Sequence, residues 1–420
     1  IWMQSGHMRR IIEKYLFDPE LTAGKMIFLT GPRQVGKTTF ALHWLDRAAG
    51  SRATYFNWDD PAVVGQYRRN PLFFRNVIDD AYGGTPVPVV FDEIHKQKGW
   101  KNLLKGIYDT GKERMTLLVT GSARLGLYRK SGDSLVGRYV SFQMFPVGLP
   151  EIADEFSYVI DDERPIADGR VFLDKARKAK ADRYTDALEK LLRFGGFPEP
   201  LLRASPRFLN RWQQDYRTLL TREDVRDLSR ISDIRGLEHL VTLLPSKVGS
   251  LLSVNSLSED LSYSHRTVAH WIEMLKEIYL VFTIRPWQRN VTRAIKKEPK
   301  LYFFDWSSLE DPGARFENMT AVTLLRMAAR FTERGLGRFE IAYVRDKEKR
   351  EVDFLLVKDN VPIALFEAKT GDEADMAMGR RFAAMLGVPF YGIVGRGQKP
   401  EAFPGNCFSI PAAAFFMLAG

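Results

Sequence analysis

Residues 31–38 read Gly-Pro-Arg-Gln-Val-Gly-Lys-Thr, which satisfies the phosphate-loop pattern G-x-x-x-x-G-K-[ST]. The glycines let the backbone wrap around phosphate groups, and the amino end of a following helix adds partial positive charge. We expect Lys37 to reach the β- and γ-phosphates of a nucleotide and the Thr38 hydroxyl to bind Mg²⁺. The expected nucleotide-binding residues are Gly31, Pro32, Arg33, Gln34, Val35, Gly36, Lys37, Thr38 and Thr39.

Two adjacent carboxylates, Asp92 and Glu93, follow an apolar run over residues 89–91. A P-loop enzyme needs one carboxylate in the Mg²⁺ shell and a second beside the attacking water. We assign the first role to Asp92 and the catalytic role to Glu93, because the chain turns where a strand ends and both side chains can then face the site. An acidic helix start after a buried strand is the alternative.

Two further residues are candidates for catalysis. Ser122 follows the apolar run 117–120, where its hydroxyl could hold the attacking water; a plain turn is nearly as good an explanation. Arg138 follows a glycine and precedes the last strand of this segment, where it could stabilise γ-phosphate charge in its own subunit or a neighbour's. An ordinary surface arginine is the alternative.

A second acidic pattern lies near the C-terminus. Glu367 and Lys369 alternate on one expected strand and therefore share a face. A three-residue turn centred on Asn360 would set Asp353 opposite Glu367, so that both carboxylates meet at one metal ion. Glu317 could complete the metal shell, and Lys369 could orient or deprotonate a water. This is a nuclease-type site; an inactive nuclease-like fold or an unrelated fold are the alternatives.

A helix over residues 264–276 is the candidate nucleic-acid contact. Val268, Ile272 and Leu275 recur at helical spacing and should face the core, which turns Arg266 outward. Few base-reading residues accompany it, so phosphate contact is expected rather than sequence recognition. The expected DNA-binding residues are Arg266, Arg285, Arg289 and Arg293. A winged helix used for packing between domains or subunits is the alternative.

The elements that must position these residues divide the chain into four parts. Apolar runs at 26–30, 54–57, 87–91 and 117–120 alternate with helical patterns, which predicts a parallel α/β sheet. We place this P-loop domain at 1–157, with 1–7 resembling a tag remnant. A helical connector (158–235), a winged helix of three helices and a β-ribbon (236–307), and a nuclease-like α/β domain (308–420) follow.

The amino-acid composition limits which kinds of partner, compartment and membrane association we expect for this protein. The 420 residues contain 62 Lys and Arg against 52 Asp and Glu, a net charge of +10 that favours a polyanionic partner such as DNA. The single cysteine, Cys407, cannot form an internal disulfide, which fits a reducing cytoplasm. The longest apolar stretch, 408–418, contains a proline and is shorter than the roughly 20 residues of a membrane span. We therefore expect no membrane segment.

Taken together, these motifs resemble the large prokaryotic family of AAA+-type P-loop ATPases that carry an uncharacterised conserved C-terminal domain. The resemblance rests on residues 31–39, 89–93, 120–122, 134–138, 195–199, 315–318 and 351–354. It implies ATP and Mg²⁺ as cofactors and a homo-oligomer, in which a ring would let Arg138 act on a neighbour's nucleotide. It assigns no role to residues 195–199.

Three functions remain open from the sequence. The first is an ATP-driven machine that remodels or translocates DNA, the second an ATP-regulated, metal-dependent nuclease, and the third an ATP-gated switch with a protein partner. DNA-stimulated ATP turnover would separate the first two from the third, and divalent-dependent cutting would separate the second from the first.

Overall fold

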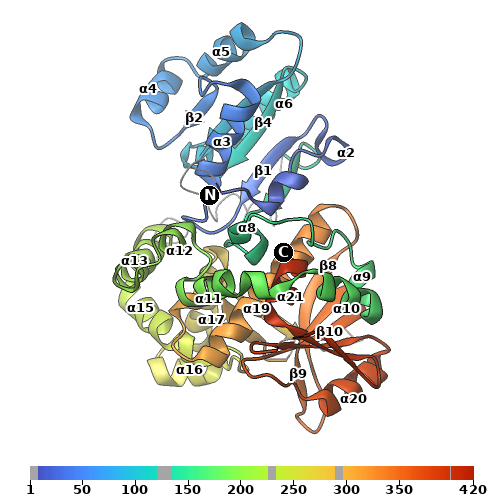
Figure 1. The fold of residues 1–420 in the computed structure, drawn as a ribbon. Helices are drawn as coiled ribbons and strands as arrows, with labels where there is room; N and C mark the ends of the chain where they lie inside the picture. Colours follow the sequence, from blue (N-terminus) through green and yellow to red (C-terminus); the bar gives the residue numbers. More distant parts are fainter. Residues whose placement is uncertain (1–7, 122–134, 226–232, 289–296, 398) are drawn as a thin grey trace. The chain divides into compact units, whose positions relative to one another are not determined.

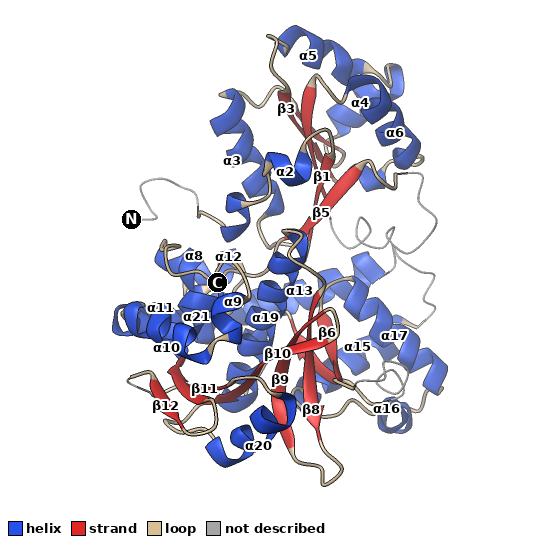
Figure 2. Ribbon diagram, turned by 90° about the vertical axis from the view of Figure 1, so that its right-hand side faces the viewer, coloured by secondary structure: helices blue, strands red, loops and turns tan. Residues whose placement is uncertain are grey.

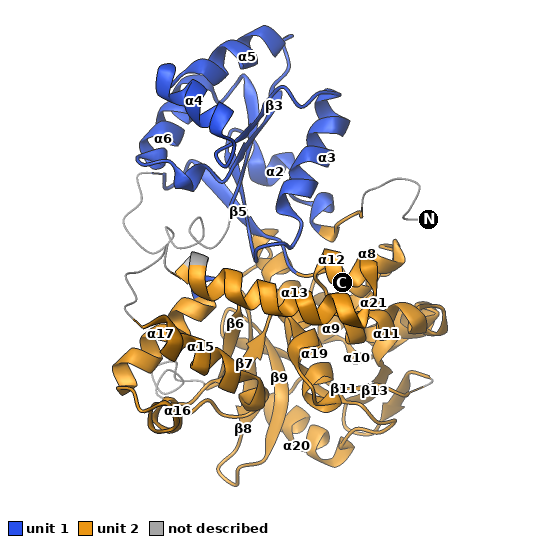
Figure 3. Ribbon diagram, turned by 90° about the vertical axis from the view of Figure 1, so that its left-hand side faces the viewer, with its two compact units in different colours: residues 1–7, 12–145, 277–279 blue, residues 8–11, 146–276, 280–420 orange. Residues whose placement is uncertain are grey.

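The computed structural model describes residues 8–121, 135–225, 233–288, 297–397 and 399–420. They divide into two compact units (Figure 3). Unit 1 comprises residues 12–145 and 277–279, and unit 2 comprises residues 8–11, 146–276 and 280–420.

Unit 1 is built on a five-stranded parallel sheet with the order β2-β3-β4-β1-β5. Its strands are β1 (Met26–Thr30), β2 (Tyr55–Asn57), β3 (Val87–Asp92), β4 (Met115–Thr120) and β5 (Tyr139–Gln143). Strands β1, β3 and β4 are almost wholly buried, as continuous apolar runs in a parallel sheet require. The predicted α/β class and its parallel sheet are confirmed.

Two short helices of unit 1 precede β1, and the others follow β1, β2 or β3 and lie in the connections between the strands (Figure 1). They are η1 (Ile11–Lys14), α2 (Pro19–Thr22), α3 (Lys37–Ala49), α4 (Pro61–Arg69), α5 (Phe73–Ala81), η2 (Ile94–Lys96) and α6 (Trp100–Gly111). Aromatic side chains dominate the core on the α5 side, where Phe56, Phe74 and Phe91 meet edge to face. Asp60 caps α4 by accepting a hydrogen bond from the Ala62 amide.

Unit 2 is built on a mixed eight-stranded sheet with the order β12-β13-β11-β10-β9-β8-β6-β7. Its strands are β6 (Val281–Pro286), β7 (Lys300–Phe303), β8 (Phe339–Arg345), β9 (Glu351–Lys358), β10 (Val361–Lys369), β11 (Phe390–Val394), β12 (Glu401–Phe403) and β13 (Cys407–Pro411). Helix α20 (Met376–Leu386) packs through Phe382 against Leu355 and Leu365. On the alternate residues of the same strands, Phe366 contacts Phe415 of α21 (Ala412–Ala419). Helices therefore cover both faces of the sheet (Figure 2).

The remaining helices of unit 2 surround this sheet. The long helix α19 (Pro312–Glu333) packs on β8 and β10, and α21 is buried along its whole length. The others are α8 (Leu149–Ala153), α9 (Arg164–Ala167), α10 (Gly169–Lys178), η4 (Ala181–Tyr184), α11 (Thr185–Phe194), α12 (Pro198–Arg203), α13 (Pro206–Leu219), η5 (Leu220–Asp224), α15 (Ile234–Leu243), η6 (Leu244–Lys247), α16 (Val254–Leu261), α17 (His265–Glu277) and η7 (Trp306–Ser308). In the described part of the chain, no helix combines the length and the apolar character that crossing a bilayer requires.

The division of the chain differs from the one expected at residues 157, 235 and 307. Unit 2 begins at Pro146 and packs the connector, the three-helix segment and the C-terminal segment together. The reason is the β-ribbon of the expected winged helix. Strands β6 and β7 pair with each other, but β6 also pairs in parallel with β8, with Arg285 opposite Ala342. The ribbon is thus the edge of the large sheet, and it ties these segments into one unit.

Residues 195–199 have a structural role that the sequence left open. Gly195 has a φ of 75°, and a Cβ atom there would lie 2.7 Å from Oδ1 of the buried Asp305. The neighbouring Gly196 carbonyl accepts a 2.6 Å hydrogen bond from the amide of Val147. These glycines therefore allow two other segments of unit 2 to approach the backbone closely.

Candidate functional sites

The phosphate loop of unit 1 lies between β1 and α3. Gly31 and Gly36 have φ values of 137° and 103°, which side chains with a Cβ atom rarely adopt. A Cβ atom at Gly31 would also collide with the carbonyl oxygen of Met144. Helix α3 begins at Lys37, directly after Gly36, so its amino end is part of the loop. This is the backbone arrangement that binds phosphate groups.

The Lys37 ammonium is buried at this loop, with the residue 7% exposed. Its Nζ donates hydrogen bonds to the carbonyl oxygens of Gly31 (2.9 Å) and Pro32 (2.6 Å). A positive charge held among loop carbonyls and beside a helix amino terminus favours a polyanionic ligand.

Asp92 lies at the carboxyl end of β3, beside Thr120 of β4. Its Oδ2 accepts hydrogen bonds from the hydroxyls of Thr38 and Tyr55, each at 2.8 Å, and its Oδ1 accepts one from Thr120. A carboxylate and a threonine hydroxyl at hydrogen-bond distance are hard oxygen donors of the kind that Mg²⁺ prefers. The residues present therefore fit the ion.

Glu93 follows in a left-handed turn with a φ of 56°, and the chain turns at the strand end as expected. Its Oε2 is buried without a hydrogen-bond partner and lies 3.4 Å from His95 Nε2. Burial raises the pKa of the Glu93 carboxyl, and the nearby Lys37 ammonium opposes that rise. A carboxylate with a raised pKa beside a phosphate loop is suited to accept a proton from water.

Other predicted residues of this site are placed differently. Arg138 precedes β5, and its carbonyl accepts a hydrogen bond from Met26 at the start of β1, whereas the phosphate loop follows the end of β1. Its guanidinium donates to Asp109 at 2.9 and 3.2 Å. The structure therefore does not bring Arg138 to the phosphate loop of its own chain. Ser122 lies outside the described residues.

Sequence reasoning missed three residues around the two carboxylates: Tyr55, Thr120 and His95. Thr120 ends an apolar strand, a position at which a polar residue on a parallel sheet faces the binding edge. Tyr55 and His95 gave no signal, because their approach to Asp92 and Glu93 depends on strand pairing and on a turn.

A second group of carboxylates lies in unit 2 around Lys300, the first residue of β7. The Lys300 side chain is only 3% exposed, and its Nζ lies 2.6 Å from Glu351, 3.7 Å from Asp353 and 3.9 Å from Glu317. The Tyr302 hydroxyl donates a 2.8 Å hydrogen bond to Glu317. We refer to Lys300, Glu317, Glu351 and Asp353 as the Lys300 cluster.

The titration of this cluster follows from its burial. Burial, together with repulsion from Asp353, raises the pKa of Glu317 to about 7, against the opposing effect of Lys300. Burial alone would lower the pKa of Lys300, but attraction to the three carboxylates outweighs it and raises that pKa. Lys300 is therefore charged and supplies the positive charge that these carboxylates require.

Asp353 and Glu367 lie near each other on two paired strands, as predicted, although the turn between these strands differs from the predicted one. Asp359 and Asn360, both with positive φ, form a two-residue turn that starts the pairing at Lys358 opposite Val361. An irregularity between Pro362 and Ala364 then shifts the register, so that Phe354 lies opposite Phe366. The Ala368 amide donates to Asp353 Oδ2 at 3.2 Å, next to Glu367.

The predicted metal site of Glu317, Asp353 and Glu367 is not present as expected. Among the described residues, no group of three or more His, Cys, Asp or Glu side chains is arranged to hold a metal ion. The physical reason is the pairing with lysines: Glu317 and Asp353 lie near Lys300, while Glu367 binds Lys369 at 2.8 Å. One oxygen of Glu367, Oε2, is nevertheless buried without a hydrogen bond.

The candidate nucleic-acid helix is α17. Val268, Ile272 and Leu275 are buried, as the helical spacing predicted, and Arg266 is exposed. Arg285 is exposed on β6. Arg289 and Arg293 lie outside the described residues.

Comparison with protein families matches two segments of the chain. Residues 23–153 match the AAA domain family, over the strands and loop that carry Lys37 and Asp92. This segment is therefore similar to AAA domains. The match supports ATP as the ligand of the phosphate loop and hydrolysis as its reaction. Residues 185–310, which include α17 and Lys300, match a domain of unknown function, DUF8612.

Similar whole proteins add little about function. An uncharacterized protein of Methanocaldococcus jannaschii is 24% identical, covering 98% of this chain and 88% of that protein. An uncharacterized protein of Mycobacterium tuberculosis is 22% identical over 67% of this chain, and the chain spans only 54% of that protein's length.

Solved structures show only weak similarity. The AMPPCP-bound replication initiator DnaA of Aquifex aeolicus is 14% identical, with a TM-score of 0.30 over 64% of this chain and 88% of that one. PCH-2 of C. elegans is 16% identical, with a TM-score of 0.25 over 49% of this chain and 65% of that one. Similarity at this level does not identify a function.

Proposed function

We propose that the chain is an ATP-hydrolysing machine whose AAA domain drives an action on DNA. The observation that supports hydrolysis most directly is the contact of Thr38 with Asp92 beside the phosphate loop, with Glu93 next to them. The loop amides and Lys37 bind the phosphate chain, while Thr38 and Asp92 would hold Mg²⁺. Bound there, Mg²⁺ supplies charge neutralisation of the phosphates.

Glu93 then acts on the water that attacks the γ-phosphate. Its buried carboxylate accepts the proton, and its raised pKa makes it a stronger base than an exposed glutamate. The interaction with His95 limits the orientations of the carboxylate. Tyr55 and Thr120 act through Asp92, whose oxygens they fix by hydrogen bonds.

Contact with DNA would occur mainly through phosphates, with Arg266 on α17 and Arg285 on β6 as the described basic residues. The net charge of +10 supports this proposal. The test is ATP turnover with single-stranded, duplex and branched DNA at two salt concentrations. Duplex binding should fall with a log–log salt slope of about −0.9 per phosphate neutralised.

Variants at two sets of arginines distinguish direct contacts with DNA phosphates from the effect of the net charge of the protein on DNA binding. Arg266→Ala combined with Arg285→Ala should reduce the salt slope by about 2, uniformly across sequences. Arg211→Ala, at an exposed arginine that pairs with Asp215 on α13, is the control and should leave the slope unchanged. DNA binding that is undetectable at low salt, with turnover unchanged by DNA, would favour an ATP-gated switch with a protein partner instead.

We also propose that the AAA domain works as a homo-oligomer, with a ring as the arrangement in which Arg138 reaches a neighbour's nucleotide. The position of Arg138, away from its own phosphate loop, supports action between chains over action within one. Arginine fingers contribute about 10³–10⁵ in rate. Mixing Lys37→Ala chains with Arg138→Ala chains should therefore restore turnover, and the absence of rescue would refute the proposal.

The nuclease alternative depends on Asp353, Glu367 and Lys369. The buried, unpaired oxygen of Glu367 favours it, whereas the pairing of Asp353 with Lys300 weighs against it. Cutting of DNA with Mg²⁺ or Mn²⁺ that Asp353→Ala and Lys369→Ala abolish, while ATP turnover survives, would establish it.

A further inference from the structure

Basic side chains cluster on α10 and η4 of unit 2. Residues 170–183 contain six basic residues against two acidic ones, a formal charge of +4. The whole chain carries +10, so this short stretch holds a large share of the excess. All six basic residues are exposed, and we refer to them as the α10 basic surface: Arg170, Lys175, Arg177, Lys178, Lys180 and Arg183.

Most of these charges have no partner in the protein. Arg177 lies 3.5 Å from Asp174, and both side chains are exposed. In the part of the chain that the structure describes, no ion pair joins the other five basic residues to a carboxylate. Lys175 and Lys178 are three positions apart and therefore neighbours on the helix surface, where like charges repel each other. An anion bound beside them would relieve that repulsion.

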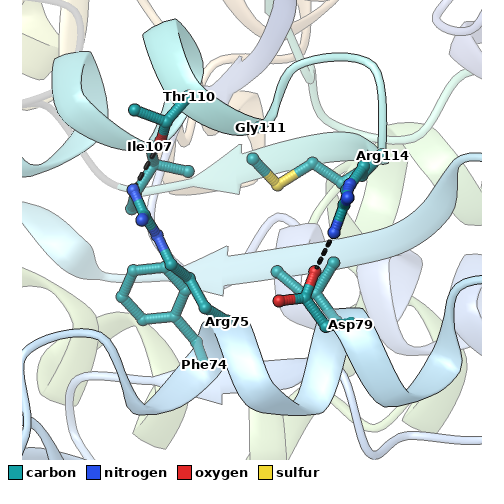
Figure 4. A pocket seen from close by; sticks show the side chains of 9 residues that line it. Phe74, Arg75, Asp79, Ile107, Thr110, Gly111 and Arg114 are labelled. Carbon is teal, nitrogen blue, oxygen red and sulfur yellow. Dashed lines mark hydrogen bonds and ion pairs between the residues drawn. The ribbon is translucent and has the colours of Figure 1, made fainter.

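Exposed arginines at other places already have carboxylate partners. Three such pairs are Arg114 with Asp79 (2.7 Å), Arg203 with Glu199 (3.1 Å) and Arg211 with Asp215 (2.8 Å). Figure 4 shows the first of them. A guanidinium group whose charge is offset by a neighbouring carboxylate attracts an additional anion less strongly than an unpaired cation does.

Helix α17, the candidate nucleic-acid helix, has no comparable excess of positive charge. Within its residues, Arg266 and Lys276 are balanced by Glu273 and Glu277, so its formal charge is zero with neutral histidines. Lys276 also binds Glu273 at 2.8 Å. Helix α17 alone therefore supplies little attraction for a polyanion.

The fold holds α10 in place and covers its apolar face. The Asp168 carboxylate caps the helix by accepting hydrogen bonds from the amides of Arg170 and Val171. Phe172 is 1% exposed, and its ring centroid lies 4.5 Å from that of Tyr391 on β11. Because this apolar face is buried inside unit 2, α10 cannot insert it into a lipid surface. A lipid headgroup layer is therefore a less suitable polyanion than a nucleic acid.

We propose that the α10 basic surface binds the phosphates of duplex DNA. This inference rests on the proposed action on DNA and names the surface that makes the contact. The 10 residues of α10 rise about 15 Å, a length over which duplex DNA presents about nine phosphate charges. Several of the six cations can therefore contact phosphates at the same time. Phosphate contacts carry no base information, so this binding is independent of DNA sequence.

The test is the salt dependence of duplex binding by the full chain, measured by fluorescence anisotropy with two labelled duplexes of different sequence. The test variant combines Lys175→Gln, Lys178→Gln and Lys180→Gln. Its log–log salt slope should be smaller by about 2–3 on both duplexes, because each lost phosphate contact removes about 0.9. The matched control combines Arg114→Gln, Arg203→Gln and Arg211→Gln, which lowers the net charge equally and should leave the slope unchanged.

The outcomes separate this surface from the proposed function itself. DNA binding with an unchanged slope in the lysine variant would overturn the α10 basic surface and leave the action on DNA in place. Equal reductions in the lysine variant and in the arginine control would also overturn it, because only the net charge would then matter. No binding of either duplex by the wild type at low salt would overturn both this inference and the proposed action on DNA.

Discussion

The phosphate loop of unit 1 and the Lys300 cluster of unit 2 both bring carboxylates together in buried surroundings, but they compensate the charge differently. Around Asp92 the described partners are three hydroxyls, those of Thr38, Tyr55 and Thr120. Around Glu317, Glu351 and Asp353 the partner is the ammonium of Lys300. Neutral donors fix a carboxylate without cancelling its charge, whereas a buried lysine cancels part of it.

The comparison explains why acidic residues alone do not predict a metal site. A cluster that already contains a buried cation gains less from binding another one, because the two positive charges repel each other. The nucleotide site also contains a buried ammonium, that of Lys37, but its printed hydrogen bonds go to the carbonyl oxygens of Gly31 and Pro32 and not to Asp92. Asp92 therefore keeps its negative charge for a cation that arrives with the nucleotide. The two regions therefore give the same residue types different partners: hydroxyl groups around Asp92 and an ammonium group around Glu317, Glu351 and Asp353.

The largest effects are expected at the nucleotide site. Glu93→Gln keeps the size of the side chain but removes the base, so turnover should fall by about 10²–10⁴ while ATP stays bound. Lys37→Ala removes a charge from the phosphates and should reduce nucleotide affinity itself. Filter binding of labelled ATP and phosphate release measure the two effects separately. Turnover at the wild-type rate in Glu93→Gln would show that another residue is the base.

The pH dependence of turnover sharpens this assignment. A general base works only when deprotonated, and burial raises the pKa of Glu93, so activity should fall on acidification at a pH above the ordinary glutamate value of about 4.3. The profile of kcat against pH, measured where the protein remains folded, checks this. An acid limb at or below that ordinary value would contradict the buried environment of Glu93.

The next largest effect is expected at Lys300. Lys300→Met leaves three carboxylates without their buried cation and should cost about 3–5 kcal/mol in urea unfolding. Addition of Mn²⁺ should recover part of that loss, because the vacated position lies among carboxylate oxygens. Lys276→Met, at a partly exposed pair with Glu273, is the control and should cost at most about 1 kcal/mol. Equal costs for the two variants would contradict the role of Lys300.

The sequence contains local motifs for the proposed nucleotide site, whose residue roles stay predictions, but it did not predict the Lys300 cluster. Residues 31–38 are one continuous stretch, and Asp92 and Glu93 are neighbours in a second one. Each can therefore be recognised from a short motif. Lys300 meets its partners only because β6 and β7 join the large sheet beside β8, and no local pattern encodes that pairing. A charged residue directly before the apolar run 301–304 was the available signal.

The pairing of the strands that carry Asp353 and Glu367 was predicted only in part. The prediction that their strands bring them together is confirmed by the pairing of Phe354 with Phe366, but the expected three-residue turn was wrong. A two-residue turn and a shift near Pro362 give the same register. Irregularities of this kind depend on local packing, which alternation along the strand does not encode.

The smallest expected effect is the change with pH of the free energy of unfolding that the titration of Glu317 causes. The pKa of Glu317 is about 7 in the folded chain and about 4.3 in the unfolded chain. The protonated carboxyl therefore contributes fully to the free energy of unfolding below about pH 4.3, and this contribution is lost as the pH rises toward 7. Glu317→Gln does not titrate and should gain about 1–3 kcal/mol relative to the wild type between those pH values. Glu310→Gln, at an exposed position, is the control and should show no such trend in urea unfolding.

The most direct test of the difference between the two regions is the number of Mn²⁺ ions bound per chain, measured by equilibrium dialysis with a non-hydrolysable ATP analogue. One ion per chain should bind in the wild type and in Asp353→Asn, and that ion should be lost in Asp92→Asn. A second ion that disappears in Asp353→Asn, or an ion that survives Asp92→Asn, would contradict the account.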